Sequence, residues 1–165
     1  MIIILMGVSG SGKTTVGRLL AKELDWPFYD GDDFHPPANV EKMRADIPLD
    51  DDDRDGWLAS LQNLIRQKID DGQNAILACS ALKQKYRARL RQDRPHEVRL
   101  VYLKGDFALI QQRLQTRRHH YMNPNLLQSQ FDALEEPADA LTIDIAKGSH
   151  AIVGIIQREL GRENE

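Results

Sequence analysis

Residues 7–14 have the types and spacing of a phosphate-binding loop, with the sequence GVSGSGKT. Gly7 and Gly12 keep side chains away from backbone amides that would surround a β-phosphate. Lys13 adds a flexible positive charge, and Thr14 adds a hydroxyl for Mg²⁺. An apolar run precedes the loop, and apolar residues at helical spacing follow it: Val16, Leu19, Leu20 and Leu24. This order of strand, loop and helix predicts a nucleoside triphosphate site, and the alternative is a chance glycine-rich turn.

A second group of reactive side chains has the sequence DGDDFHP at residues 30–36. It follows an expected strand, and ligands of open parallel sheets gather beyond the carboxyl ends of strands. Acids at alternate positions could point one toward a metal and its neighbour toward a substrate hydroxyl, and phosphoryl transfer needs both tasks done. The alternative is an acidic turn that caps a helix starting near Pro36.

The segment after the third expected strand carries Ser80 and Lys83. Many phosphate-loop proteins have a metal-binding aspartate at this strand end, but here Cys79 and Ser80 occupy the place. The metal must therefore depend on Thr14 and the acids near Asp30. Ser80 and Lys83 become candidates for contacts with a substrate hydroxyl and carboxylate. The alternative is that they only start the following helix.

An acidic run at residues 50–53 ends at Arg54. Acids at a helix N-terminus are favoured by the free N–H groups and the helix dipole. Arg54 carries a planar donor fork that suits a carboxylate ligand. A salt bridge between Arg54 and the local aspartates is an equally simple reading.

The polar, basic segment at residues 117–124 separates two expected helices and is predicted to be a mobile lid of about residues 117–125. Such loops close over phosphates and exclude water from the reaction. A solvated surface turn is the alternative.

The elements that must position these residues alternate between short apolar runs and helical periods, which is typical of an α/β domain with a parallel sheet. We expect strands at residues 2–6, 27–30, 75–79, 98–103 and 141–145. The clearest helix carries Trp57 through Ile69 on one face, with Asp53 or an adjacent acid as its cap and Gly72 at its end.

Composition narrows the class of protein. The chain has 165 residues, 41% of them hydrophobic and 28% charged, which suits one domain over residues 1–165. A balance of 22 basic against 25 acidic residues argues against a nucleic-acid partner. No apolar run reaches the roughly 20 residues of a membrane helix. The single cysteine, Cys79, excludes an internal disulfide, so we expect a cytoplasmic protein with no membrane partner.

Taken together, these blocks resemble the small phosphate-loop gluconokinases, which are related to shikimate kinase and the nucleoside monophosphate kinases. The resemblance also includes residues 39–43, 48–54, 79–83, 103–106, 129–131 and 134–137, and so covers nearly the whole chain. It implies a five-stranded parallel sheet in the order 2-3-1-4-5, a lid, and a homodimer. The implied reaction transfers the γ-phosphoryl group of ATP, with Mg²⁺, to the 6-hydroxyl of D-gluconate.

The resemblance also implies roles for individual residues. Lys13, Asp32 and Arg117 would be catalytic, and Thr14 and Asp30 would hold the metal. The sugar-acid pocket would contain Asp32, His35, Arg54, Ser80 and Lys83. The nucleotide would bind to Gly7, Val8, Ser9, Gly10, Ser11, Gly12, Lys13, Thr14, Thr15 and Arg113, with adenine near residues 146–148.

Two departures from the family pattern and two rival functions remain open. Asp46 stands where the family generally has glycine, and the lid sequence HYMNP at residues 120–124 lacks an expected phenylalanine.

A related kinase acting on shikimate, a nucleoside or a nucleoside monophosphate is the nearer rival. A nucleotide-dependent switch is the other, although the chain has no guanine-reading motif.

Overall fold

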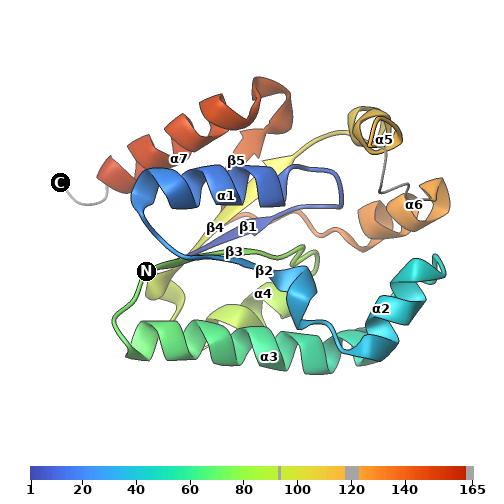
Figure 1. Ribbon diagram of the computed structural model, residues 1–165, viewed down its shortest axis with the longest axis horizontal. Helices are drawn as coiled ribbons and strands as arrows, with labels where there is room; N and C mark the ends of the chain where they lie inside the picture. Colours follow the sequence, from blue (N-terminus) through green and yellow to red (C-terminus); the bar gives the residue numbers. More distant parts are fainter. Residues whose placement is uncertain (93, 118–122, 163–165) are drawn as a thin grey trace.

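The computed structural model describes residues 1–92, 94–117 and 123–162, and its centre is a five-stranded sheet (Figure 1). The spatial order is β2-β3-β1-β4-β5, and every pairing is parallel. The carboxyl ends of all the strands therefore lie at one edge, which confirms the predicted sheet. The strands are β1 (Ile2–Met6), β2 (Phe28–Asp30), β3 (Ala75–Ala78), β4 (Val98–Lys104) and β5 (Leu141–Asp144).

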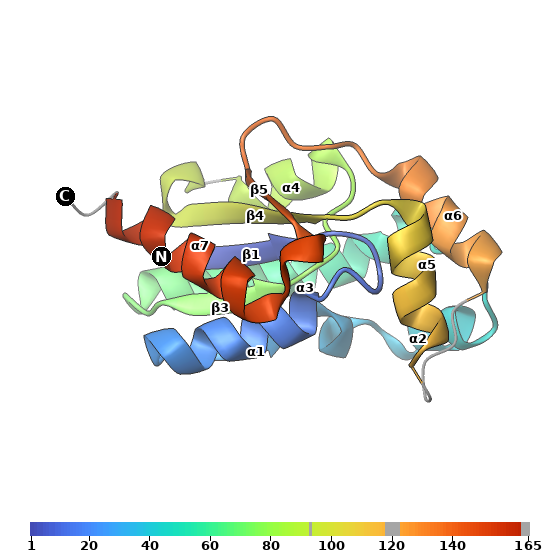
Figure 2. The ribbon, with the colours of Figure 1, turned by 90° about the horizontal axis from the view of Figure 1, so that it is seen from above.

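Helices cover both faces of this sheet. Figures 1 and 2 show α1 and α7 against one face, α3 and α4 against the other, and α2 and α6 beyond the carboxyl ends of the strands. The helices are α1 (Lys13–Leu24), α2 (Pro37–Arg44), α3 (Asp51–Asp70), α4 (Gln84–Arg91), α5 (Phe107–Gln115), α6 (Pro124–Ala133) and α7 (Ser149–Arg162). Short 3₁₀ turns are η1 (Gly31–Phe34), η2 (Pro95–Glu97) and η3 (Ile145–Lys147). In the part of the chain that the structure describes, no helix has the length and apolar character to cross a membrane.

All side chains of the central strand β1 are buried. Alternate side chains of a strand point to opposite faces, and helices cover both faces of this sheet. Ile3 and Leu5 join the core formed with α1 and α7. Ile2, Ile4 and Met6 join the core formed with α3 and α4. This double burial anchors the start of the phosphate-binding loop, which follows Met6 directly.

The predicted boundaries differ from the observed ones by a residue or two. β2 begins at Phe28, β3 ends at Ala78, and Ile145 already belongs to the turn η3. α3 is capped by Asp50, whose carboxylate accepts from the Asp53 amide in a capping box. Asp53 itself lies in the first turn of the helix, and its carboxylate accepts from the Asp50 amide.

A buried arginine joins the loop after β3 to the segment after α6. Arg87 is 2% exposed, and it donates to the carbonyl oxygens of Ala81 (2.8 Å), Leu82 (3.0 Å) and Glu135 (2.8 Å). Ala81 has a φ of 45°, in the left-handed region. Arg87 thus holds a strained loop at the carboxyl edge of the sheet.

We expect Arg87→Met to lower the free energy of unfolding by about 3 kcal/mol, because buried carbonyl oxygens would lose charged donors. Urea denaturation followed by circular dichroism measures the change. Arg87→Lys keeps the charge, so its free energy of unfolding should lie between those of the native protein and Arg87→Met. A loss below about 1 kcal/mol for Arg87→Met would show that water replaces the guanidinium without cost.

Candidate active site

The phosphate-binding loop at residues 7–14 joins β1 to α1 at the carboxyl edge of the sheet. Gly10 and Gly12 have φ values of 80° and 97°, which side chains disfavour. A Cβ at Gly7 would lie 2.9 Å from the carbonyl oxygen of Leu103. α1 starts without a side-chain cap, whereas side chains cap α3, α5 and α6. The first amides of α1 are therefore open to an anion.

The ammonium of Lys13 lies inside this loop. Its Nζ donates to the carbonyl oxygens of Gly7 and Val8, both at 2.9 Å. Burial lowers the pKa of Lys13, while the carboxylate of Asp32 raises it and the guanidinium of Arg117 lowers it. Asp32 and Arg117 therefore lie near enough to Lys13 for their charges to act on it.

A threonine and a carboxylate meet where β2 ends. Thr14 Oγ1 donates to Asp30 Oδ2 at 3.1 Å, and the other oxygen of Asp30 accepts from the Asp32 amide at 3.0 Å. Within the described residues, no group of three or more His, Cys, Asp or Glu side chains could hold a metal alone. Mg²⁺ is usually held by one or two carboxylates together with substrate phosphates, so these hard oxygen donors fit it.

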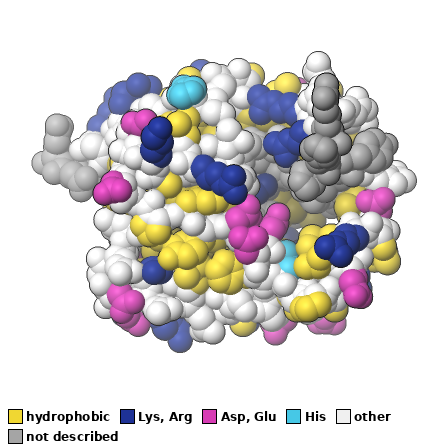
Figure 3. Space-filling model, in the orientation of Figure 1, with side chains coloured by type: hydrophobic (Ala, Val, Ile, Leu, Met, Phe, Trp, Pro, Cys, Tyr) yellow, Lys and Arg dark blue, Asp and Glu magenta, His cyan; other side chains and the backbone are white. Residues whose placement is uncertain are grey.

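The side chain of Asp32 is exposed, and charged groups of the site surround its carboxyl group. Desolvation by nearby protein atoms raises the pKa of Asp32, the charge of Lys13 lowers it, and the charges of Asp30 and Asp33 raise it. Figure 3 shows acidic side chains next to a hollow at this end of the molecule, with basic side chains across it. A carboxylate with a raised pKa is a better proton acceptor than an ordinary surface aspartate.

The two arginines predicted near the lid differ in what they touch. Arg113 donates to the carbonyl oxygen of Ile145 at 2.8 Å, which places it beside the loop proposed for adenine. Arg117 follows α5, and its amide donates to Leu114 at 3.3 Å. Residues 118–122 of the predicted lid lie outside the described residues.

The imidazole of His35 is held between α2 and α3. It stacks on the indole of Trp57 with ring centroids 4.4 Å apart and planes 12° apart. Trp57 in turn donates to the carbonyl oxygen of Gly31 at 2.7 Å. Burial, with a further contribution from Arg54, lowers the pKa of His35 to about 4. The ring is therefore neutral at pH 7.

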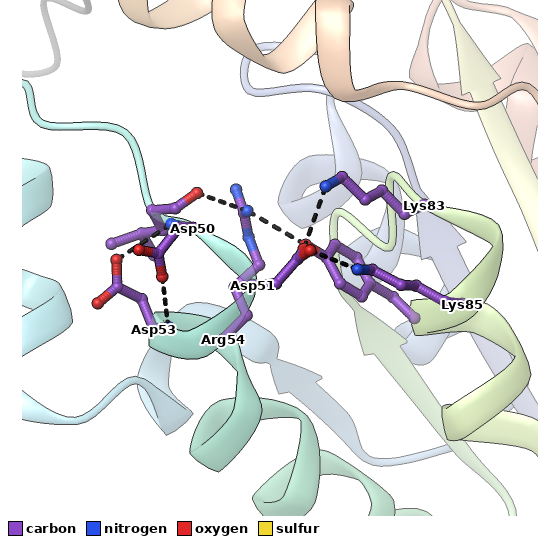
Figure 4. A network of polar contacts seen from close by, with 8 residues as sticks. Asp50, Asp51, Asp53, Arg54, Lys83 and Lys85 are labelled. Atoms are coloured by element: carbon purple, nitrogen blue, oxygen red, sulfur yellow. Dashed lines mark hydrogen bonds and ion pairs between the residues drawn. The ribbon is translucent and has the colours of Figure 1, made fainter.

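Arg54 does not pair with the local aspartates, so the salt-bridge alternative from the sequence is wrong. It donates to the carbonyl oxygen of Leu49 (2.6 Å) and to the Tyr86 hydroxyl (3.3 Å), as Figure 4 shows from close by. Asp53 is engaged by Lys42 at 2.8 Å instead. Within the described chain, the hydrogen bonds of Arg54 come from one terminal nitrogen, which leaves a guanidinium edge for a ligand carboxylate.

Lys83 forms an ion pair with Asp51. Its Nζ lies 3.1 Å from Asp51 Oδ1, and the same carboxylate accepts from Lys85 and Tyr86 (Figure 4). These donors, Lys85 first, hold the pKa of Asp51 well below its usual range. Lys83 does precede α4, but its side chain makes no cap. The carbonyl oxygen of Ser80 accepts from the Gly7 amide at 3.3 Å, so Ser80 adjoins the phosphate-binding loop.

Comparison with known proteins decides the family. Residues 9–149 match the family model described as shikimate kinase. A probable gluconokinase of Xenopus tropicalis is 42% identical in an alignment 180 positions long, gaps included, which covers 99% of this chain and 95% of the relative. The chain belongs to the shikimate kinase family, among the gluconokinases.

Two further gluconokinases are similar to this chain, one in sequence and one in structure. The thermoresistant gluconokinase of Escherichia coli K12 is 41% identical over 92% of this chain and 89% of its own. A crystal structure of a gluconokinase from Sinorhizobium meliloti superposes with a TM-score of 0.83 at 35% identity, over 99% of this chain and 97% of that one.

The departure from the gluconokinase pattern at Asp46 leaves the turn intact. Asp46 follows α2 with a φ of 55°, in the left-handed region that glycine prefers. Its amide donates to Met43 at 3.2 Å, and the next amide, of Ile47, donates to Lys42 at 2.8 Å. Aspartate tolerates this conformation better than most residues, which explains why glycine is not required here.

A contact that sequence reasoning missed joins α6 to the phosphate-binding loop. Gln130 accepts from the Ser9 amide at 2.8 Å and donates to the Ser9 hydroxyl at 3.0 Å. The segment around Gln130 carried part of the family resemblance, but nothing in the sequence assigned this partner. Ser11 is fully buried in the same loop, and Thr15 is exposed in the first turn of α1.

Proposed function

We propose that this protein is an ATP-dependent gluconokinase that phosphorylates D-gluconate on its 6-hydroxyl and releases 6-phospho-D-gluconate and ADP. One observation carries the proposal beyond the family. Thr14 of the phosphate-binding loop donates to Asp30 at 3.1 Å, and the same carboxylate accepts from the Asp32 amide at 3.0 Å, so the loop and Asp32 meet where β2 ends. A phosphoryl donor site and a proton acceptor are thus neighbours.

The nucleotide half of the site consists of the uncapped start of α1 and the loop before it. The ammonium of Lys13 would leave the loop carbonyls to bind β- and γ-phosphate oxygens. Thr14 and Asp30 would hold Mg²⁺, which when bound neutralises phosphate charge. Arg113 and Arg117 would stabilise the charge that develops on the transferred group.

The acceptor half of the site would hold an extended sugar acid. Arg54, Lys83 and His35 supply donors, and Ser80 lies beside the phosphate-binding loop. The carboxylate of gluconate would bind the open edge of Arg54 and share Lys83 with Asp51. Asp32 would then orient the primary alcohol and accept its proton.

The remaining features are proposals of the same kind. The lid at about residues 117–125 would close on the bound substrates, and residues 1–165 would act as a single domain. We also propose a cytoplasmic homodimer, for which light scattering of the purified protein measures the mass.

Incubation of purified protein with ATP, Mg²⁺ and gluconate, followed by mass spectrometry of the products, tests the function. A coupled assay for ADP release should give activity with gluconate and little with shikimate, CMP or glucose. Preference for shikimate or CMP would identify a related kinase instead. Nucleotide binding without phosphorylation of any sugar acid would indicate a switch.

Recognition of the substrate carboxylate gives a separate prediction. We expect Arg54→Ala to raise the KM for gluconate about 30-fold, equivalent to about 2 kcal/mol for a lost charged hydrogen bond, with a smaller change in kcat. The KM for ATP should stay near its original value. Steady-state kinetics with each substrate varied in turn gives these constants.

Two controls separate carboxylate recognition from general damage. Arg89→Ala removes a nearby arginine that pairs with Asp55 on the surface, and it should leave both KM values nearly unchanged. Glucose has no carboxylate, so its poor reaction should change little in the Arg54→Ala protein. Equal losses for gluconate and glucose would rule out Arg54 as the carboxylate ligand.

A further inference from the structure

The side chain of Asn39 bridges α2 and α3 beside the proposed sugar-acid pocket. Asn39 is 3% exposed, and its Nδ2 donates to the backbone carbonyl oxygen of Asp53 at 2.7 Å. The same Nδ2 lies 3.2 Å from Nδ1 of His35. One buried amide nitrogen therefore contacts both a carbonyl oxygen and an imidazole nitrogen.

The carbonyl of Asp53 determines which way this amide faces. A backbone carbonyl oxygen only accepts hydrogen bonds, so the amide nitrogen of Asn39 must point toward it. If the amide were reversed, the side-chain oxygen of Asn39 would lie 2.7 Å from the carbonyl oxygen of Asp53, and two acceptors would face each other. The amide nitrogen has two hydrogens and accepts no bond, so it donates to His35 as well.

A donor facing Nδ1 determines the proton position on His35. Nδ1 must accept, so in the neutral ring the proton lies on Nε2. A charged imidazolium would turn an N–H toward the hydrogens of Asn39, which disfavours it further. Stacking on Trp57 fixes the plane of the ring. In the part of the chain described, Nε2 has no hydrogen-bond partner.

We propose that Asn39 is a positioning residue that holds His35 as the Nε2–H tautomer, so that His35 offers the acceptor substrate a hydrogen-bond donor. The substrate group that it meets must then be an oxygen lone pair of a hydroxyl or carboxylate. His35 in this form accepts no proton through Nε2, which leaves proton removal to Asp32. The statement about substrate rests on the proposed gluconokinase function, whereas the tautomer does not.

Long-range ¹H–¹⁵N correlation spectra of the ligand-free protein at pH 7 report the tautomer directly. His35→Gln identifies the signals of His35 among those of the 5 histidines. We expect an unprotonated Nδ1 and a protonated Nε2 in the native protein. A proton on Nδ1 would overturn the proposal, whatever the enzyme phosphorylates.

Asn39→Asp replaces the donor with an acceptor and should move the proton of the neutral ring from Nε2 to Nδ1. The KM for gluconate should rise about tenfold, as expected for one lost neutral hydrogen bond, while the KM for ATP is kept. Asn39→Ala adds no charge and should give a mixture of tautomers. Asn74→Asp makes the same charge change next to the N-terminus and should alter neither spectrum nor KM.

Each outcome separates the possible roles. An unchanged tautomer in folded Asn39→Asp and Asn39→Ala proteins would show that Asn39 only supports packing, and would overturn the proposal. A changed tautomer with an unchanged KM for gluconate would remove His35 from the acceptor site. Absence of gluconate phosphorylation by the native protein would refute the proposed function but not the tautomer.

Discussion

Replacing Lys13 by alanine is expected to lower kcat for gluconate phosphorylation by roughly 10³-fold or more. Phosphoryl transfer depends on placement and on stabilisation of developing phosphate charge, and Lys13 is the cation inside the phosphate-binding loop. Among the described lysines, only Lys13 donates a hydrogen bond to that loop, so other lysines are poor substitutes. Coupled assays at saturating ATP and gluconate measure the effect.

A matched control for Lys13 is available on the same helix. Lys22→Ala removes a lysine from the last turn of α1, far from the loop, and should keep kcat within about twofold. Circular dichroism should show both variants folded. Near-normal turnover of a folded Lys13→Ala protein would contradict the proposed catalysis.

Replacing Asp32 by asparagine is expected to lower kcat about 10²- to 10⁴-fold, the usual contribution of a positioned general base. Asparagine has nearly the same shape but accepts no proton from the substrate alcohol. Binding of ATP should change little, because the phosphate-binding loop and Thr14 remain in place. Turnover assays and calorimetric titration with ATP measure the two quantities separately.

Asp33→Asn is the matched control for Asp32, since it makes the same change one residue away on an exposed side chain. It should reduce kcat only a few-fold. Equal losses of turnover and ATP affinity in Asp32→Asn would place Asp32 in nucleotide binding rather than proton transfer.

The fold could be predicted from the sequence because its signals are local. The strands are short and mostly apolar, with β1 and β3 buried along their whole length. Each connection contains a helical period, so alternation alone predicts a parallel sheet. The observed strand ends differ from these expectations by one residue. Ile145, for example, leaves β5 to enter a turn.

The partners of the charged residues could not be predicted in the same way. In the acidic run at residues 50–53, helix capping uses Asp50, Lys42 engages Asp53, and Asp51 meets Lys83 from another segment. The sequence alone left Arg54 paired with an aspartate or free. The structure favours a free guanidinium edge, because Arg54 donates to Leu49 and Tyr86 while lysines pair with Asp51 and Asp53.

By itself the sequence determined the phosphate-binding loop, the order of the elements and the candidate residues at the strand ends. These follow from residue types at fixed short spacings, where backbone geometry leaves few alternatives. Tertiary structure alone decided that Gln130 binds Ser9, that Asn39 faces His35, and that Asp51 forms ion pairs with two lysines. Hydrogen bonds between distant segments depend on side-chain direction and on competition among donors, and both exist only after the helices pack on the sheet.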